Sequence, residues 1–126
     1  MASLLLDTHA VLWWLTDSPR LPVRVRDAIS DSATAIYASA ASGYGVAYKQ
    51  GLGKLPQDLP DLAAALAQQG IVALPVTLSH RVAAGRLPKP RRDPWDRIIM
   101  AQALVEGFTV VTVDPVFAEC GVPVPW

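Results

Sequence analysis

Four short apolar runs alternate with stretches of helical character, and this alternation restricts the fold more than any other feature of the sequence. Each run has the length and composition of a buried strand, and the segments between the runs have the apolar spacing of helices. Strands that alternate with helices form a parallel sheet covered on both faces, so the sequence predicts an α/β sandwich with a central parallel sheet flanked by helices. The runs are SLLLD at 3–7, TAIYAS at 34–39, IVALPV at 71–76 and FTVVTVD at 108–114.

The helical segments are bounded by residues that start or stop helices. Pro22 stands where the first turn of the second helix would begin, and Val23, Val25 and Ile29 supply its apolar contacts. Glycines are expected to end two of the helices, and two prolines make 87–92 a loop. Helices are expected at 8–15, from 22, at 39–49 (ended by Gly51 and Gly53), 58–70 (ended by Gly70), 78–87 and 93–107, then a short helical turn at 114–120 and at most an edge strand at 122–126.

Length and composition describe one domain and exclude several classes of protein. The chain has 126 residues and no visible repeat or linker, so a single domain over 1–126 is expected. Eleven basic residues balance eleven acidic ones, so a charged partner has to be met by a local patch. Cys120 is the only cysteine, which excludes an internal disulfide. The apolar runs are shorter than the ~18 residues of a membrane span, and the N-terminus lacks a basic region, so a cytoplasmic protein without a membrane partner is expected.

Acidic residues stand where the predicted elements meet. Asp7 and Asp114 end the first and the last apolar run, and Asp93 and Asp96 open the helix at 93–107. Taken singly, each is explained as a helix cap or as a favourable charge in a first helical turn. Ligand sites of open α/β sheets, however, lie beyond the carboxyl ends of the strands, where Asp7 and Asp114 are expected. Carboxylates that converge there repel one another unless a cation neutralises them.

A site made of carboxylates, without His or Cys ligands, selects hard cations. Mg²⁺ or Mn²⁺ is therefore the expected cofactor, held by a few acids and waters and completed by phosphate oxygens of a substrate. Such a site indicates phosphodiester chemistry, in which the cation polarises a phosphoryl oxygen and a carboxylate orients or deprotonates the attacking water.

Positive charge gathers beside the acids that open the long helix. A solvated surface is the simpler interpretation of scattered basic residues, but a proline-spaced basic loop next to candidate metal ligands favours binding of an RNA backbone. The cluster holds six of the eleven basic residues within 17 positions: Arg81, Arg86, Lys89, Arg91, Arg92 and Arg97.

Other conspicuous side chains allow weaker inferences. Thr112 is a candidate supporting residue beside Asp114, and His9 could reach the strand-end cleft, although a surface histidine with one hydrogen bond is the simpler interpretation. His80, on the basic helix, is expected at the solvated surface. The tryptophans are expected in the core or at an interface rather than as base-stacking platforms; they are Trp13, Trp14 and Trp95.

Four stretches resemble PIN-domain ribonucleases, specifically the VapC-type toxins of bacterial type II toxin–antitoxin pairs. They are LLLDTHAVLWWL, SAASGYGVAYKQGLGKL, RDPWDRIIMAQAL and TVVTVDPVFAECGVPVPW, with TLSH between, and they span nearly the whole chain. The resemblance implies a PIN-like sandwich, a Mg²⁺- or Mn²⁺-dependent endoribonuclease and a homodimer. It also implies a cognate VapB-type antitoxin that forms a heterotetramer or larger complex with the toxin. Carried over by motif, Asp7 is the first metal acid, Asp96 the third and Asp114 the fourth, with Asp93 an accessory acid.

The second acid of this pattern is missing. The family's S-x-W/Y-E-I/V-A-x-K stretch is similar to SGYGVAYK at 42–49, and Gly45 stands where its glutamate is expected. Loss of one carboxylate weakens cation binding, so a folded protein with reduced or lost nuclease activity is expected. Gly45 is interpreted as an inactivating change, with a naturally degenerate member as the alternative. A catalytically silent protein that binds an antitoxin is the competing function, whereas LLLDTH and TVDP lack the acids and lysine of phospho-receiver domains and the DxD of HAD-type phosphatases.

Overall fold

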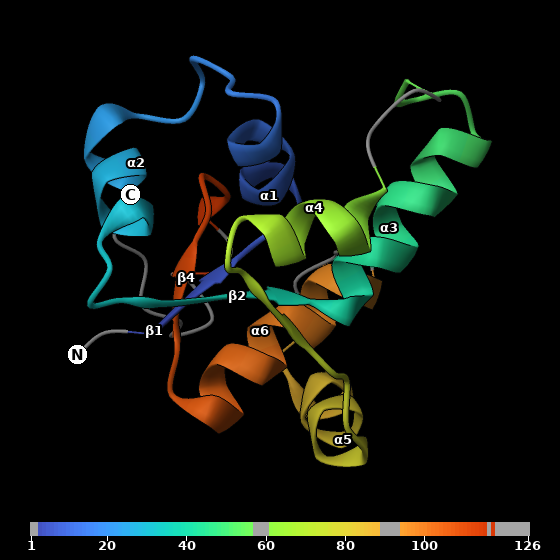
Figure 1. Ribbon diagram of the computed structural model, residues 1–126. Helices are drawn as coiled ribbons and strands as arrows, with labels where there is room; N and C mark the ends of the chain where they lie inside the picture. The colour runs from blue at the N-terminus through green and yellow to red at the C-terminus, as the bar shows by residue number, and fades with distance from the viewer. Residues whose placement is uncertain (1–2, 57–60, 89–93, 116, 118–126) are drawn as a thin grey trace.

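The computed structural model describes residues 3–56, 61–88, 94–115 and 117, and over these residues strands and helices alternate as predicted (Figure 1). The strands are β1 (Ser3–Leu6), β2 (Ala35–Ser39), β3 (Val72–Leu74) and β4 (Thr109–Val111). The helices are α1 (Thr8–Leu15), α2 (Val23–Ser30), α3 (Ala40–Gly51), α4 (Leu62–Gln68), α5 (Leu78–Arg86) and α6 (Pro94–Glu106).

The strands form one parallel sheet in the order β3-β2-β1-β4. Leu6, the last residue of β1, pairs with Ala38 in β2 and with Val111 at the end of β4. The three strands therefore end at a common carboxyl edge. Helices α1 and α3 begin at this edge, directly after β1 and β2, which confirms the predicted sandwich around a parallel sheet.

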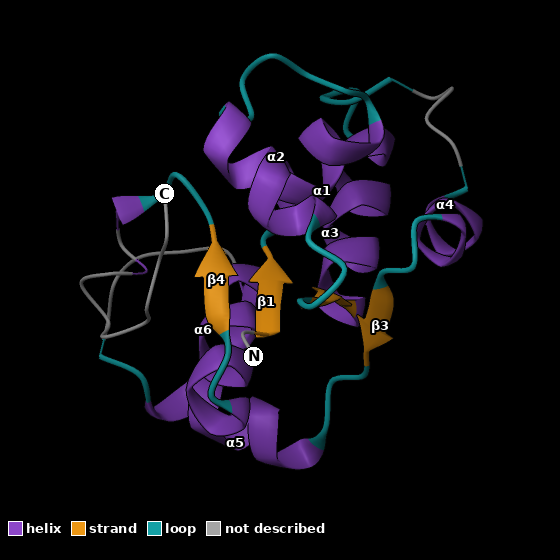
Figure 2. Cartoon of the chain, turned by 60° about the vertical axis from the view of Figure 1, so that its left-hand side comes forward, coloured by secondary structure: helices purple, strands orange, loops and turns teal. Residues whose placement is uncertain are grey.

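Helices cover both faces of the sheet, as Figure 2 shows. On one face, Leu4 and Leu6 of β1 pack in a core with residues of α1, α2 and α4. On the other face, Leu5 packs with Ile99 and Met100 of α6, and α5 lies against α6. Successive strand residues point to opposite faces, so three consecutive leucines serve two cores. Continuous apolar runs are the expected consequence of burial on both faces.

Two valines that were expected to be buried, Val23 and Val72, are exposed. Val23 is 72% exposed, whereas Val25 and Ile29 are buried, because α2 turns only one stripe of its surface to the core. The run IVALPV was expected to be a buried strand, yet Val72 is 53% exposed. Strand β3 lies at the edge of the sheet and has a neighbour on one side only, which explains its exposure.

The expected surface position of His80 is also wrong, because its side chain is only 1% exposed. Its Nδ1 accepts a hydrogen bond from the backbone N–H of Thr77, and the Thr77 hydroxyl accepts one from the N–H of His80, a reciprocal cap at the start of α5. Because Nδ1 accepts, the ring proton resides on Nε2, which lies 2.9 Å from a carboxylate oxygen of Glu106 in α6. A polar side chain is thus buried with both nitrogens satisfied, and it ties α5 to α6.

The helix ends largely follow the sequence. Gly70 and Gly107 adopt left-handed φ angles of 71° and 76° just beyond α4 and α6, which residues with a side chain rarely adopt. No helix among the described ranges is long and apolar enough to cross a lipid bilayer. Most of the predicted loop at 87–92, most of the segment after Asp114, and Cys120 lie outside the described residues.

Candidate active site

Asp7 is the buried acid at the carboxyl edge of the sheet. It follows the last residue of β1 and caps α1, because its Oδ1 accepts a hydrogen bond of 2.8 Å from the N–H of Ala10. Its own N–H donates to the carbonyl oxygen of Val111 at 3.1 Å, which holds it beside the end of β4. Asp7 is nevertheless buried, with only 5% of its surface exposed to solvent. The helix cap thus uses one carboxylate oxygen of Asp7. It does not explain why the whole acid is buried.

Thr112 joins Asp7 to Asp114. Its hydroxyl donates to Oδ2 of Asp7 at 2.5 Å and accepts from the backbone N–H of Asp114 at 3.0 Å. Burial raises the pKa of Asp7 above its ordinary value. Hydrogen bonds from Thr112 and Ala10 and the charge of His9 act in the opposite direction, and the charge of Asp114 raises the pKa further. Two acids at the carboxyl edge therefore interact, as the sequence predicted for Asp7 and Asp114.

The donor set fits a hard cation in part. Both acids offer carboxylate oxygens, and Mg²⁺ is commonly held by one or two carboxylates together with waters and phosphate oxygens. Asp96 lies in the first turn of α6 and is partly buried, while Asp93 lies outside the described residues. Across the described ranges no three His, Cys, Asp or Glu side chains are grouped to hold a metal. The metal and catalytic roles of these acids stay predictions.

At Gly45, where the resemblance predicted a glutamate, the space is filled. Gly45 is buried in the middle of α3, and a Cβ atom built on it would lie 3.2 Å from both Cδ1 and Nε1 of Trp95 in α6. One turn earlier, the hydroxyls of Ser42 and Thr8 are 3.0 Å apart and hydrogen-bonded, which ties α3 to the start of α1. Helix α3 thus contacts α1 through the Ser42 hydroxyl, and its Gly45 faces the indole of Trp95 in α6.

Comparison with known proteins identifies the family. The model of the PIN domain matches residues 4–122. The chain belongs to the PIN-domain family. It is 30% identical over 117 residues to Ribonuclease VapC22 of Mycobacterium tuberculosis (strain ATCC 25618 / H37Rv), across 90% of this chain and 88% of that protein. This relative confirms the resemblance to VapC-type proteins.

Solved structures share the PIN fold at low sequence identity. The structure of VapBC2 from Rickettsia felis, bound to a DNA fragment from their promoter, matches with a TM-score of 0.68 and 14% identity, covering 97% of this chain and 96% of that chain. FitAcB from Neisseria gonorrhoeae matches with a TM-score of 0.61 and 20% identity, covering 96% and 95%. Both confirm the fold.

Three aromatic side chains of this PIN domain adjoin Gly45. The ring centroids of Tyr44 and Tyr48 are 5.9 Å apart, and that of Trp95 lies 5.4 Å from Tyr44 and 5.5 Å from Tyr48. Trp95 was expected in the core or at an interface, and it is partly buried, in contact with two exposed tyrosines. The spacing of Tyr44 and Tyr48 by four residues in a helix is the signal in the sequence that could have predicted this cluster.

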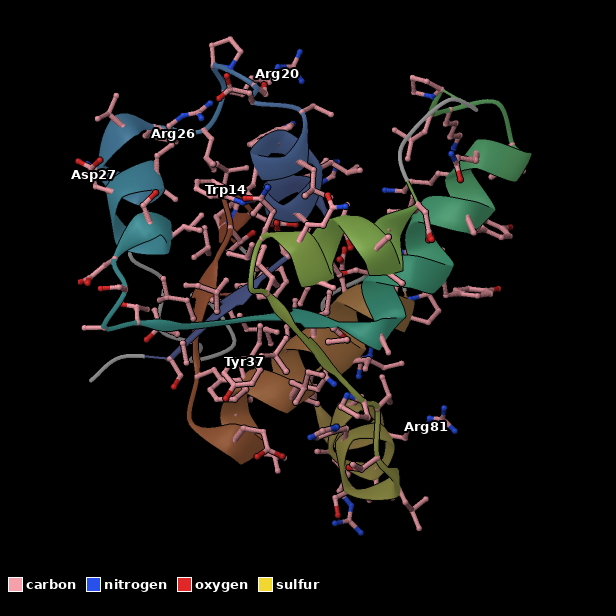
Figure 3. All side chains as sticks on the ribbon, in the orientation of Figure 1. Trp14, Arg20, Arg26, Asp27, Tyr37 and Arg81 are labelled. Atoms are coloured by element: carbon pink, nitrogen blue, oxygen red, sulfur yellow. The ribbon has the colours of Figure 1, made fainter. Side chains whose placement is uncertain are left out.

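The predicted basic cluster of the PIN domain divides into different environments. Arg81 and Arg86 are exposed, and Figure 3 shows Arg81 extending away from α5. Arg97 instead donates to the carbonyl oxygens of Ala84 at 2.8 Å and Leu87 at 3.1 Å, so it joins α6 to the end of α5. RNA binding by these arginines stays a prediction, as it does for the remaining members, which lie outside the described residues: Lys89, Arg91 and Arg92.

His9 is exposed in the first turn of α1. Its ring lies 5.8 Å from that of Trp13, and its charge lowers the pKa of Asp7, although less than the hydrogen bonds to that carboxylate do. His9 therefore stands at the solvent side of the acidic edge.

Proposed function

We propose that this PIN domain is the toxin of a type II toxin–antitoxin pair, an endoribonuclease that depends on Mg²⁺ or Mn²⁺ and whose catalysis is impaired by Gly45. The observation that carries the proposal is the linkage of Asp7 and Asp114 through the Thr112 hydroxyl at the carboxyl edge of the sheet. The similarity to a protein named Ribonuclease VapC22 supports RNA as the substrate.

The proposed reaction is hydrolysis of a phosphodiester, in which a water oxygen attacks phosphorus and the bond to the leaving oxygen breaks. A divalent cation, when bound, would supply Lewis acidity at a phosphate oxygen. Asp7 and Asp114 would hold that cation, with Asp96 and Asp93 completing the acidic set. Thr112 orients the pair, because one hydroxyl contacts the Asp7 carboxylate and the Asp114 backbone together.

Impairment follows from two properties of position 45. Glycine offers no carboxylate, so the cation and the attacking water lose one partner. The indole of Trp95 also occupies the space into which a side chain at 45 would extend. This second property favours the competing function, a catalytically silent protein that retains the toxin fold and binds an antitoxin.

A VapB-type antitoxin is the proposed partner, in a heterotetramer or larger complex built on a homodimer. Its support is that the similar structures of VapBC2 and FitAcB carry the names of two-component assemblies. A cytoplasmic location is part of the same proposal.

The test is to supply the missing carboxylate. Gly45→Glu and its uncharged match Gly45→Gln are each made in the native chain and in a Trp95→Leu background, which provides room. Cleavage of RNA is measured with Mn²⁺, with Mg²⁺ and with EDTA, alongside growth arrest on expression in a bacterial host.

We expect metal-dependent cleavage to rise with Glu and not with Gln, most clearly in the Trp95→Leu background. Asp7→Asn should abolish whatever cleavage is gained. Cleavage that is absent from all variants would refute impairment by Gly45 alone and favour the silent antitoxin-binding protein.

A further inference from the structure

Two tyrosines on the outward side of α3 are unusually exposed to solvent. Tyr44 is 61% and Tyr48 is 47% exposed, although both have large rings that are commonly buried. Their rings stack with an interplanar angle of 22° and lie one helical turn apart. Trp95 meets Tyr44 edge-on and Tyr48 at a tilt, and it is itself partly buried. We call Tyr44, Tyr48 and Trp95 the aromatic platform.

Glycine at 45 lets the aromatic platform form. The indole of Trp95 lies so close to α3 that a Cβ at this position would be only 3.2 Å from two of its ring atoms. Trp95 thus packs against both tyrosine rings, which remain largely exposed to solvent. Prearranged rings lose little conformational freedom when a flat ligand stacks on them.

A hollow opens at each end of the aromatic platform. Tyr44 and Trp95 line a hollow of about 510 Å³, and Tyr48 and Trp95 line another of about 430 Å³. Both volumes are in the range of sites for small organic groups. The second hollow is also lined by His9, two residues beyond Asp7, so it extends toward the acidic edge of the sheet.

Positive charge borders both hollows. Arg81 lines the hollow at Tyr44, and Lys49 and Lys54 line the hollow at Tyr48. No described acidic residue lines either one. The chain as a whole has a formal net charge of zero, because 11 basic residues balance 11 acidic ones. The excess of basic residues around the two hollows is therefore a local feature of this surface.

We propose that the aromatic platform binds single-stranded RNA by stacking unpaired bases on Tyr44 and Tyr48, while Lys49, Lys54 and Arg81 contact the backbone. The proposal rests on the proposed ribonuclease function, and it names the class of substrate that reaches the acidic edge. Exposed aromatic rings with flanking cations are the means by which proteins bind unpaired bases. In duplex RNA the base faces are stacked on one another, so they are closed to these rings.

The test measures binding in EDTA, so that cleavage plays no part. The probes are a fluorescein-labelled oligouridine of about 12 nucleotides, within the usual span of single-strand sites, an abasic oligomer of the same length, and an RNA duplex of that length. Fluorescence anisotropy is followed for the native chain, for Tyr44→Leu/Tyr48→Leu and for the matched control Tyr44→Phe/Tyr48→Phe, which keeps both rings. Circular dichroism and light scattering check folding and mass.

We expect the native chain and the Phe variant to bind oligouridine more tightly than the abasic oligomer or the duplex. The Leu variant should lose about 5- to 150-fold in affinity for oligouridine per stacked base and bind it like the abasic oligomer. Lys49→Gln and Lys54→Gln should instead weaken all single-stranded probes alike and reduce the salt dependence.

Equal binding of oligouridine by the Phe and Leu variants overturns the proposal. Equal affinity of the native chain for oligouridine and for the abasic oligomer also overturns it. So does a Leu variant that differs from the native chain only in its smaller mass, because this face would then be an interface between copies of the chain. Because the binding assay contains no metal, its result does not depend on cleavage, which is measured in the separate assay with Mn²⁺ or Mg²⁺. Base-dependent binding in EDTA, with no cleavage by any position-45 variant in the metal assay, supports the aromatic platform and counts against the nuclease. Metal-dependent cleavage together with equal binding by the Phe and Leu variants supports the nuclease and overturns the aromatic platform.

Discussion

The contact between Gly45 and Trp95 predicts that alanine at position 45 changes stability in opposite directions in two backgrounds. In the middle of a helix, replacing Gly by Ala favours the folded state by about 1 kcal/mol. Here the added Cβ would lie 3.2 Å from two atoms of the indole ring, closer than ordinary contact. Overpacking of this kind costs roughly 1–3 kcal/mol.

The cost is expected to exceed the gain, because Trp95 cannot retreat without loosening its contacts at 5.4 Å and 5.5 Å to Tyr44 and Tyr48. Gly45→Ala should therefore lower the free energy of unfolding by about 1 kcal/mol. In a Trp95→Leu background the crowding is gone, and the same change should raise it by about 1 kcal/mol. The coupling between the two sites is thus about 2 kcal/mol.

Gly43 supplies a matched control in the same helix. A Cβ there would meet only Cδ2 of Leu62, at the ordinary distance of 3.9 Å. Gly43→Ala should therefore raise the free energy of unfolding by about 1 kcal/mol in both backgrounds. Urea unfolding followed by circular dichroism gives all of these values. If Gly45→Ala stabilises the native chain as much as Gly43→Ala does, the reasoning from the indole contact is refuted.

Two further predictions concern buried polar groups. Because burial raises the pKa of Asp7, the folded, metal-free protein binds its proton more tightly than the unfolded chain, and stability falls as pH rises from the ordinary value of 3.8 through the raised one. Asp7→Asn, which keeps a capping oxygen, should be more stable than the native chain at pH 7 and lose this advantage below about pH 3.8; lower stability at pH 7 would contradict the inference. His80→Phe should lower the free energy of unfolding by about 1–3 kcal/mol, because it removes the hydrogen bonds of the buried imidazole to the N–H of Thr77 and to Glu106, each worth roughly 0.5–1.5 kcal/mol. The exposed neighbour Arg81→Gln should change it by less than about 0.5 kcal/mol in the same urea titration, and equal effects would show that the cap contributes nothing.

Much of the fold was predictable because it follows from local patterns. Apolar runs with helical segments between them predicted the parallel sheet. The positions at which those runs end predicted that Asp7 and Asp114 lie at its carboxyl edge. The interpretation of Asp7 as a helix cap and as a member of an acidic site proved compatible, since one carboxylate oxygen meets Ala10 and the other meets Thr112.

The failures share a different physical origin. His80 has the polarity of a surface residue. The local cap at Thr77 satisfies one of its ring nitrogens, but its burial is favourable only because Glu106 of α6 satisfies the other. Arg97 belongs to a run of basic residues, yet carbonyl oxygens at the end of α5 engage its guanidinium. Val72 has the composition of a buried strand, and its place in an edge strand exposes it. In each case the deciding neighbour comes from another element.

The order of strands and helices, their approximate ends and the acids at the strand ends could be predicted from the sequence, because propensity, capping and apolar spacing act over a few neighbouring residues. The resemblance also predicted a glutamate at the position where Gly45 stands. What fills the space at Gly45 could be seen only once the helices were packed together. The indole of Trp95 reaches Gly45 because α6 packs on α3, and packing between elements distant in sequence leaves no local pattern from which it can be inferred.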